Sequence, residues 1–220
     1  MNARESKKTS FPTFDLEASA FAEGFDVIAG IDEAGRGPWA GPVVAAAVVL
    51  DAANIPVGLN DSKKLHAVKR DELFDEITAS AEVGIGIADV ALIDDRNILW
   101  ATMWAMADGM RRLNVKPALA LIDGNRAPKI DCPARTVVKG DGISLSIAAA
   151  SIIAKVTRDR MMVELDSTFP GYDFARHKGY GTAIHQDALA RLGPCPAHRR
   201  SFAPIRAMLD TPPALTISGN

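Results

Sequence analysis

The segment of residues 29–50 constrains the fold more than any other part of this chain. Four apolar side chains within residues 25–31 predict one β-strand. Residues 43–50, which no polar side chain interrupts, predict a second strand that is buried on both faces. Three glycines and two prolines lie between the two runs, at positions 35, 37, 38, 41 and 42. They predict a tight connection whose backbone can approach a ligand closely.

Two adjacent carboxylates, Asp32 and Glu33, stand where the first of these strands enters the connection. Neighbouring residues of a strand point to opposite faces, so both can serve one site only if the strand ends or bends there. The ordinary alternative for an Asp-Glu pair is an exposed turn. The apolar strand before the pair and the Gly-Arg-Gly after it favour a functional site.

Length and composition indicate one domain, with or without an appended subdomain. The 220 residues can bury a proper core. We expect residues 1–24 to form a flexible N-terminal extension with one helical turn within 15–22, residues 25–210 to form the folded domain, and residues 211–220 to form a flexible tail. The first 24 residues lack the apolar core of a signal peptide, and no apolar run approaches the roughly 20 residues of a membrane span. These features predict a cytoplasmic protein without a membrane partner.

Charge is distributed unevenly along the chain, whose net charge is −2. Residues 170–206 contain six lysines and arginines against two acids, and three of the four histidines. A basic surface beside an acidic pocket would suit a phosphodiester held over metal ions, although solvated basic faces are common. The two cysteines, Cys132 and Cys195, form neither a disulfide framework nor a metal knuckle, so we expect free thiols.

Hydrophobic periodicity in the rest of the chain predicts an α/β protein with a mixed sheet. Further strands are expected at residues 83–90, 117–122 and 136–139. Helices are expected at residues 67–81, from 94 or 95 to 113, at 143–169, from about 183 to 192, and at 204–209.

Two more acids occupy positions that resemble those of the first pair. Asp123 ends a short buried strand, and Asp141 lies just before the long helix, where amide groups favour an anion. Separate segments can therefore bring four carboxylates to one pocket. Because the chain has no histidine-rich or cysteine-rich ligand set, oxygen-preferring Mg²⁺ or Mn²⁺ is expected over zinc.

These motifs, taken in order, resemble bacterial ribonuclease HII, the type 2 ribonuclease H family. The matching segments are GIDEAGRGP at 30–38, LNDSKKL at 59–65, LIDGN at 121–125, KGD at 139–141, IAAASIIAKVTRD at 147–159 and KGYGT at 178–182. The resemblance implies a ribonuclease H-like fold, with a central mixed β-sheet flanked by helices and a helical C-terminal part. It also implies endonucleolytic cleavage of RNA paired with DNA and of single ribonucleotides embedded in a DNA duplex, hence roles in ribonucleotide removal and RNA primer removal.

The resemblance also assigns residues to roles. The family's metal-site acids correspond to Asp32, Glu33, Asp123 and Asp141. Its ribose-reading residues correspond to Gly35, Arg36 and Gly37, and its junction-sensing tyrosine corresponds to Tyr180, which could otherwise be a half-buried core residue.

Several basic residues are weaker candidates for contacts with the nucleic-acid backbone. Lys63 and Lys64 either contact phosphate or simply begin an exposed helix. Further phosphate-contact candidates are Lys155, Arg158, Lys178 and Arg199, and His177 and His198 could also reach the backbone.

Phosphodiester hydrolysis explains why such a site needs several acids. Two divalent ions, about 3.5–4 Å apart, can activate the attacking water and hold the leaving 3′-oxygen. We assign Asp32 as the bridging ligand, with Glu33 and Asp123 each holding one ion. Asp141 is either a ligand or an organiser of the water. The expected products carry a 3′-hydroxyl and a 5′-phosphate, with the cut on the 5′ side of the ribonucleotide.

The partners expected from this assignment are an RNA/DNA hybrid and a ribonucleotide-containing DNA duplex. No sliding-clamp peptide is visible, and a monomer is expected. Trp39 stands where many relatives would carry an aliphatic side chain, so the loop could pack differently here. Two rival functions remain: a transposase-like DNA nuclease that uses the same acids, and a catalytically silent hybrid-binding module.

Overall fold

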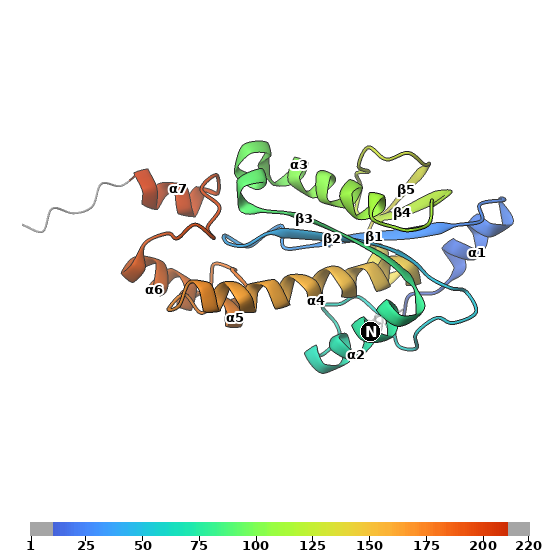
Figure 1. Cartoon of the computed structure of the whole chain (residues 1–220), viewed down its shortest axis with the longest axis horizontal. Helices are drawn as coiled ribbons and strands as arrows, with labels where there is room; N and C mark the ends of the chain where they lie inside the picture. Colours follow the sequence, from blue (N-terminus) through green and yellow to red (C-terminus); the bar gives the residue numbers. More distant parts are fainter. Residues whose placement is uncertain (1–10, 211–220) are drawn as a thin grey trace, which may run out of the picture.

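A five-stranded mixed sheet forms the centre of the computed structural model, which describes residues 11–210 (Figure 1). The strands are β1 (Ile28–Ala34), β2 (Val43–Val49), β3 (Glu82–Ala88), β4 (Leu119–Asp123) and β5 (Ala134–Val137), in the spatial order β3-β2-β1-β4-β5. β1 pairs antiparallel with β2 and parallel with β4; β2–β3 is antiparallel and β4–β5 is parallel. The predicted α/β fold with a mixed sheet is confirmed.

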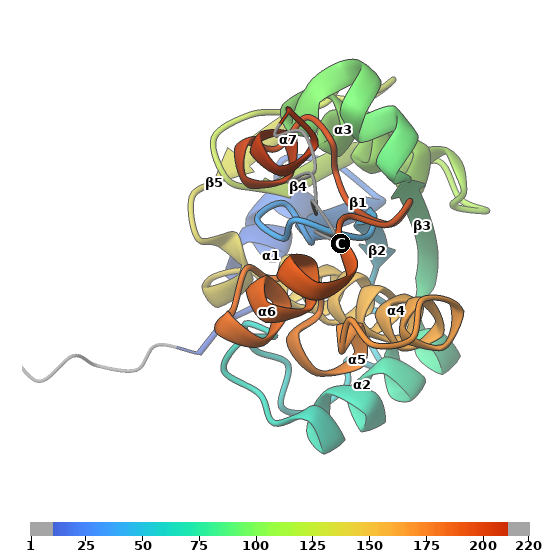
Figure 2. The same ribbon diagram turned by 90° about the vertical axis from the view of Figure 1, so that its left-hand side faces the viewer.

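Helices cover both faces of this sheet. They are α1 (Asp15–Ala22), α2 (Ala67–Ser80), α3 (Val90–Arg111), α4 (Leu145–Thr168), α5 (Phe174–His177), α6 (Ala183–Leu192) and α7 (Ala203–Asp210). Viewed from one end of the sheet, α3 lies on one face and α4 on the other, with α2 beyond α4 (Figure 2). α5, α6 and α7 gather at one end of the sheet, which confirms the expected helical C-terminal part.

The apolar run of β2 is buried on both faces, as predicted. Ala46 and Val48 pack in a cluster with α2 and α4, whereas Ala45 and Ala47 pack in a separate cluster with α3. The first half of α4 is rich in alanine and serine, so it approaches β1 closely. A Cβ added at Gly30 would lie 2.1 Å from the carbonyl carbon of Ser146, and only glycine fits there.

Helix α3 differs from its predicted form. It begins at Val90 rather than at residue 94 or 95, because the Asp89 side chain accepts a hydrogen bond from the Leu92 amide at 2.8 Å and caps the helix. The helix is broken at Asn97, whose φ of 66° is left-handed. The Asn97 side chain then accepts from the Leu99 amide at 3.0 Å and caps the second segment.

Residues 15–22 form the full helix α1, which is packed on the fold, in contrast to the loose extension expected for residues 1–24. The buried Glu17 carboxylate accepts hydrogen bonds from the Ser144 and Ser146 hydroxyls and from the Ser146 amide at 2.9 Å. Ser144 is also the N-cap of α4. A buried acid therefore joins α1 to the start of the long helix.

Other expectations have different outcomes. Residues 1–10 and 211–220, predicted to be flexible, lie outside the described residues. Cys132 and Cys195 are free, as predicted. Within residues 11–210, no helix has both the length and the apolar character that a membrane crossing requires. The cytoplasmic location and the monomeric state stay predictions.

Candidate active site

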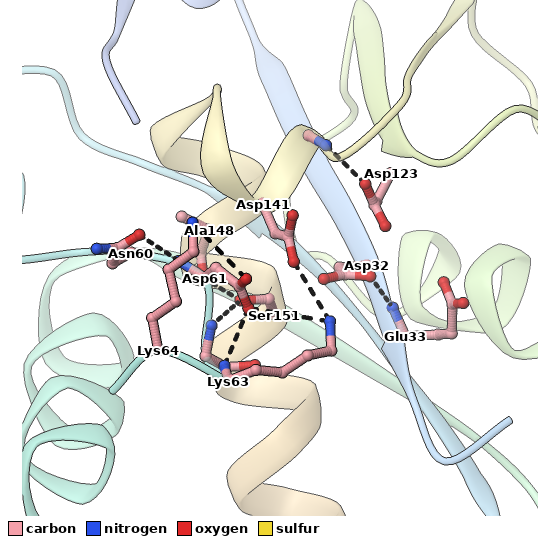
Figure 3. Close-up of polar contacts among 12 residues, drawn as sticks. Asp32, Glu33, Asn60, Asp61, Lys63, Lys64, Asp123, Asp141, Ala148 and Ser151 are labelled. Carbon is pink, nitrogen blue, oxygen red and sulfur yellow. Dashed lines mark hydrogen bonds and ion pairs between the residues drawn. The ribbon is translucent and has the colours of Figure 1, made fainter. Parts of the chain in front are cut away.

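Neighbouring strands bring three of the predicted acids to one edge of the sheet. β1 and β4 run side by side in parallel, so Asp32, Glu33 and Asp123 lie near their carboxyl ends (Figure 3). β1 does not end at Asp32 but continues to Ala34. The Asp32 side chain accepts a hydrogen bond from the Glu33 amide at 2.7 Å, and both residues reach one cavity.

The fourth acid, Asp141, comes from the short 3-10 helix Gly140–Gly142, which precedes α4. This turn is fixed to β4 because the Gly140 amide donates to Asp123 Oδ1 at 2.7 Å. Asp141 is 7% exposed and points toward the other acids (Figure 3). The predicted anion position before the long helix is therefore a separate turn, and Ser144 caps the helix itself.

A cavity of about 410 Å³ lies in front of these acids. Of the residues predicted as site residues, its wall includes Asp32, Glu33, Asp123, Gly35, Arg36, Gly37, Lys63 and Tyr180. Asp141 and Lys64 are not part of this wall. Asp141 nevertheless contacts a residue of the cavity wall, because the Lys63 ammonium lies 3.3 Å from Asp141 Oδ2.

The acids are held close enough to disfavour one another's charge. Burial raises the pKa of Asp32 well above its ordinary value, and the charges of Glu33, Asp123 and Asp141 raise it further. Burial also raises the pKa of Glu33, against the opposing effect of Arg36, whose Nη1 lies 3.1 Å from Glu33 Oε1. Burial and the nearby Asp61 raise the pKa of Asp141. The edge thus holds more negative charge than its surroundings neutralise.

Lys63 supplies the positive charge that faces this edge. Burial opposes its ammonium charge, but Asp32, Asp141 and Asp61 together raise its pKa above the ordinary value. Its side chain is nevertheless 73% exposed, so it can move away from the acids. Lys64 lies 3.9 Å from Asp61, outside the cavity.

The donor set fits hard divalent cations. All four side chains offer carboxylate oxygens, which Mg²⁺ and Mn²⁺ prefer. A cation would relieve the repulsion that raises the pKa of Asp32. In the present conformation, no three His, Cys, Asp or Glu side chains among residues 11–210 are grouped around a single point as ligands of one ion. Asp32, Glu33 and Asp123 instead line the cavity, and Asp141 lies beside Lys63 (Figure 3).

The predicted ribose-reading residues face the same cavity. Gly35, Arg36 and Gly37 form one wall, and Tyr180 lies opposite Gly37, where an added Cβ would be 3.6 Å from the tyrosine ring. Tyr180 is 48% exposed, so it is not a core residue. The Trp39 ring packs against Gly181, beside this tyrosine.

Two of the predicted phosphate contacts are wrong. Arg158 and Arg199 are 1% and 0% exposed, and their guanidinium groups bind backbone carbonyls of the protein. His177 and His198 are also buried. The His177 ring bonds to the Tyr172 carbonyl at 2.7 Å, and the His198 ring contacts the His185 ring at 2.9 Å. All four side chains are buried, and of these only Arg158 borders the cavity.

The other two phosphate candidates lie differently. Lys155 lines the cavity and pairs with Asp159 at 2.7 Å. Lys178 donates to the Ala175 carbonyl at 2.6 Å. Arg70 was not predicted as a site residue, but it lines the cavity and donates to the Ser62 and Leu65 carbonyls, which fixes the turn that carries Lys63. Its helical position resembles any exposed arginine, so no signal marked it.

Comparison with known proteins identifies what the chain resembles. The family model described as Ribonuclease HII matches residues 29–205. The chain is 56% identical to a Ribonuclease HII of Azorhizobium caulinodans over 195 residues, which cover 89% of this chain and 75% of that protein. It is 56% identical to a Ribonuclease HII of Rhizorhabdus wittichii over 194 residues, which cover 88% and 94%. The crystal structure of the ribonuclease H2 from Pyrococcus horikoshii OT3 matches with a TM-score of 0.70 and 26% identity, covering 83% of this chain and 97% of that one.

Proposed function

This chain belongs to the ribonuclease HII family, and on that premise we propose that it cuts on the 5′ side of single ribonucleotides embedded in duplex DNA, with two divalent ions held by the four acids. Members of the family are hydrolytic endoribonucleases that act on RNA/DNA substrates and depend on divalent metal. The chain is therefore a ribonuclease H. The finer proposal rests above all on the buried, mutually repelling carboxylates that border the cavity.

The acids would hold the ions from different elements. Asp32, the most buried carboxylate of β1 and β4, would be shared by both ions, with Glu33 and Asp123 each holding one. When bound, the ions supply an activated water and stabilise the leaving 3′-oxygen. The products would carry a 3′-hydroxyl and a 5′-phosphate. Mg²⁺ and Mn²⁺ both suit the oxygen ligands.

The protein's own groups would orient these acids and the substrate. Arg36 holds Glu33, and the Gly140 amide holds Asp123. Asp141 would bind an ion or orient the attacking water, and Lys63, now beside it, would turn to a phosphate.

Recognition of RNA requires a contact with the 2′-hydroxyl. Gly35 and Gly37 expose backbone to the cavity without a side chain in the way, and Tyr180 stands opposite. We place the ribose between this loop and the tyrosine. An enzyme with this selectivity would remove stray ribonucleotides and RNA primers from DNA.

The test is cleavage of a DNA duplex that carries one ribonucleotide, with Mg²⁺, Mn²⁺ or EDTA, beside an all-DNA duplex. We expect a metal-dependent cut only 5′ of the ribonucleotide. Asp32→Asn should abolish it, whereas the matched control Asp95→Asn, which changes an exposed acid paired with Arg96, should not. Cutting of the all-DNA duplex would instead favour a transposase-like nuclease. Binding without cutting under every metal would favour a silent binding module.

A further inference from the structure

Arg199 uses its whole guanidinium group to hold one loop, residues 35–42. It is 0% exposed. Its Nε donates to the Gly41 carbonyl at 2.9 Å, its Nη1 to those of Arg36 at 3.0 Å and Pro38 at 2.8 Å, and its Nη2 to those of Gly35 at 2.6 Å and Pro42 at 3.2 Å. A guanidinium has five N–H donors, so none is left for a ligand.

Arg158 joins this loop to the one that carries Tyr180. Its Nε donates to the Pro42 carbonyl at 2.9 Å and its Nη2 to that of Ala40 at 3.1 Å. Its Nη1 donates to the Lys178 carbonyl at 3.0 Å, two residues before the tyrosine. One buried side chain therefore fixes the separation of the two walls of the cavity.

The two arginines are unusual because no acid pairs with them directly; Asp159 favours the charge of Arg158, and Asp94 that of Arg199, only from a greater distance. Within residues 11–210, neither forms an ion pair. Burial lowers the pKa of Arg158 to about 10. Burial and the charge of Arg158 lower the pKa of Arg199 to about 9. Burying a cation without a directly paired acid costs free energy. Stability alone therefore does not explain why this loop is built around two arginines.

Gly35 is matched to this arrangement. Its φ of +95° disfavours any other residue, and a Cβ added there would lie 2.0 Å from Arg158 Nε. The loop therefore closes on the guanidinium group only with glycine at this position.

The arginines also determine which way the peptide groups of the loop point. In a trans peptide, the C=O and the following N–H point in opposite directions. Because the carbonyls of Gly35 and Arg36 point at Arg199, the amides of Arg36 and Gly37 point away from it, toward the exposed side of the loop. Neither amide donates to a protein group within the described part of the chain.

We propose that Arg158 and Arg199 are positioning residues that give the enzyme its preference for ribose over deoxyribose. Arg199 turns the amides of the loop outward, and Arg158 sets the distance from that loop to Tyr180. This inference rests on the proposed function, because it takes residues 35–37 as the ribose contact. In this proposal neither arginine touches the substrate: Arg158 borders the cavity but is 1% exposed, and Arg199 is 0% exposed.

The experiment compares Arg199→Lys and Arg158→Lys with Arg200→Lys, a matched change at the exposed neighbouring residue. A lysine keeps the charge but cannot bond several carbonyls in fixed directions. Fluorescence anisotropy in EDTA would give the Kd of each variant for a duplex with one ribonucleotide and for the same duplex in all-DNA form. Thermal unfolding would establish that each variant is folded.

We expect wild type and Arg200→Lys to prefer the ribonucleotide duplex, and each buried-arginine variant to lose about tenfold of that preference, with all-DNA affinity within about twofold of wild type. An unchanged preference would overturn the inference, and so would an equal loss on both duplexes, which would indicate phosphate contacts. If wild type cuts at the ribonucleotide and these variants keep the preference, the inference alone fails. If wild type does not cut, the proposed function fails.

NMR of the wild-type protein tests the inference without requiring any variant to fold. On addition of the ribonucleotide duplex, the backbone amide resonances of Arg36 and Gly37 should shift. The guanidinium N–H resonances of Arg158 and Arg199 should stay protected from hydrogen exchange and unshifted. A large shift of either guanidinium would show direct contact and overturn the positioning role.

Discussion

The acidic edge of the sheet and the interior beneath loop 35–42 both gather like charges, but they treat them in opposite ways. At the edge, burial and neighbouring carboxylates raise the pKa of Asp32, and Lys63 is the nearest ammonium to Asp141. Beneath the loop, Arg199 is fully buried without an acid, yet backbone carbonyls satisfy every one of its donors.

The difference separates charge used for binding from charge used for architecture. Carboxylates that repel one another and line an open cavity are stabilised by a cation that comes from outside. The Arg199 guanidinium, whose donors are all used, has nothing left to offer a ligand, but it fixes the backbone around it. The number of hydrogen-bond partners of a buried ion, more than its sign, therefore indicates its role in this protein.

Asp32→Asn should give the largest effect. We expect at least about a 10³-fold loss of kcat on a ribonucleotide-containing duplex, because the variant removes a charge that stabilises the reacting centre. The metal-free variant should also unfold at a higher temperature, by about 2–4 °C for each kcal/mol of repulsion removed. Steady-state kinetics and calorimetry with EDTA measure the two effects.

The sign of the stability effect follows from the raised pKa of Asp32. A folded-state pKa above the unfolded value means that the folded protein binds the proton more tightly. Stability from this group is then present at low pH and is lost as pH rises from the unfolded pKa of about 3.9 toward the higher folded value. A lower melting temperature for Asp32→Asn than for wild type at pH 7 would contradict the repulsion between carboxylates that we infer.

Divalent metal should stabilise the wild-type protein more than Asp32→Asn. At a free concentration 100 times Kd, a cation that binds only the folded state adds about 2.7 kcal/mol to the free energy of unfolding. Urea unfolding with and without Mn²⁺ measures this gain. Equal gains in the two proteins would place the cation away from Asp32.

Glu17 tests whether a buried acid that is satisfied by hydrogen bonds stabilises the fold, in contrast to the repelling acids of the edge. Its Oε1 accepts several hydrogen bonds. Glu17→Ala should lower the free energy of unfolding by about 1.5–3 kcal/mol, since the Ser144 and Ser146 groups lose a charged acceptor. Urea unfolding measures the loss. Glu23→Ala, which breaks an exposed pair with Arg135, is the control and should change little. A stabilised Glu17→Ala would place this acid with the repelling ones.

The buried histidines predict an acid-sensitive C-terminal part. Burial lowers the pKa of His185 and of His198 to about 4. Both are therefore neutral in the fold, and their contribution is present above the unfolded pKa of about 6.5 and is lost as pH falls from there toward 4. We expect a loss of about 1–3 kcal/mol, measured by urea unfolding between pH 7.5 and 4.5. His198→Asn should flatten this dependence, and the exposed-site control His66→Gln should leave it unchanged.

The sequence was most informative where function or burial imposed a local pattern. The uninterrupted apolar run of β2 predicted burial on both faces, and a strand end predicted the place of Asp123, whereas β1 continues past Asp32 to Ala34. The predicted roles of the four acids and of Tyr180 stay predictions until they are tested. The convergence of Asp32, Glu33 and Asp123 follows from the parallel pairing of β1 with β4, and the Gly140–Asp123 hydrogen bond brings the turn of Asp141 beside them.

The sequence was least informative where a side chain bonds to distant backbone. Arg158 and Arg199 resemble surface arginines in the sequence, because carbonyl acceptors leave no mark in residue type. Glu17 lies 129 residues from Ser146, so nothing local connected α1 to α4. Asn97 sits inside an apolar helical pattern, and only the folded backbone shows that it ends one segment and caps the next.

Lys63 and Lys64 should give the smallest effect and the finest test of the comparison. Lys63 is a neighbour of Asp141 at 3.3 Å and lines the cavity, whereas Lys64 lies outside it. If Lys63 can leave Asp141 and bind a phosphate of the substrate, Lys63→Ala should raise KM about 2–5-fold. The slope of log affinity against log salt concentration should also become shallower by about one. Lys64→Ala should stay within about twofold of wild type. Kinetics at several salt concentrations measure both. Equal effects of Lys63→Ala and Lys64→Ala would show that both lysines act only through their general positive charge. The acids beside Lys63 would then give it no special role in substrate binding.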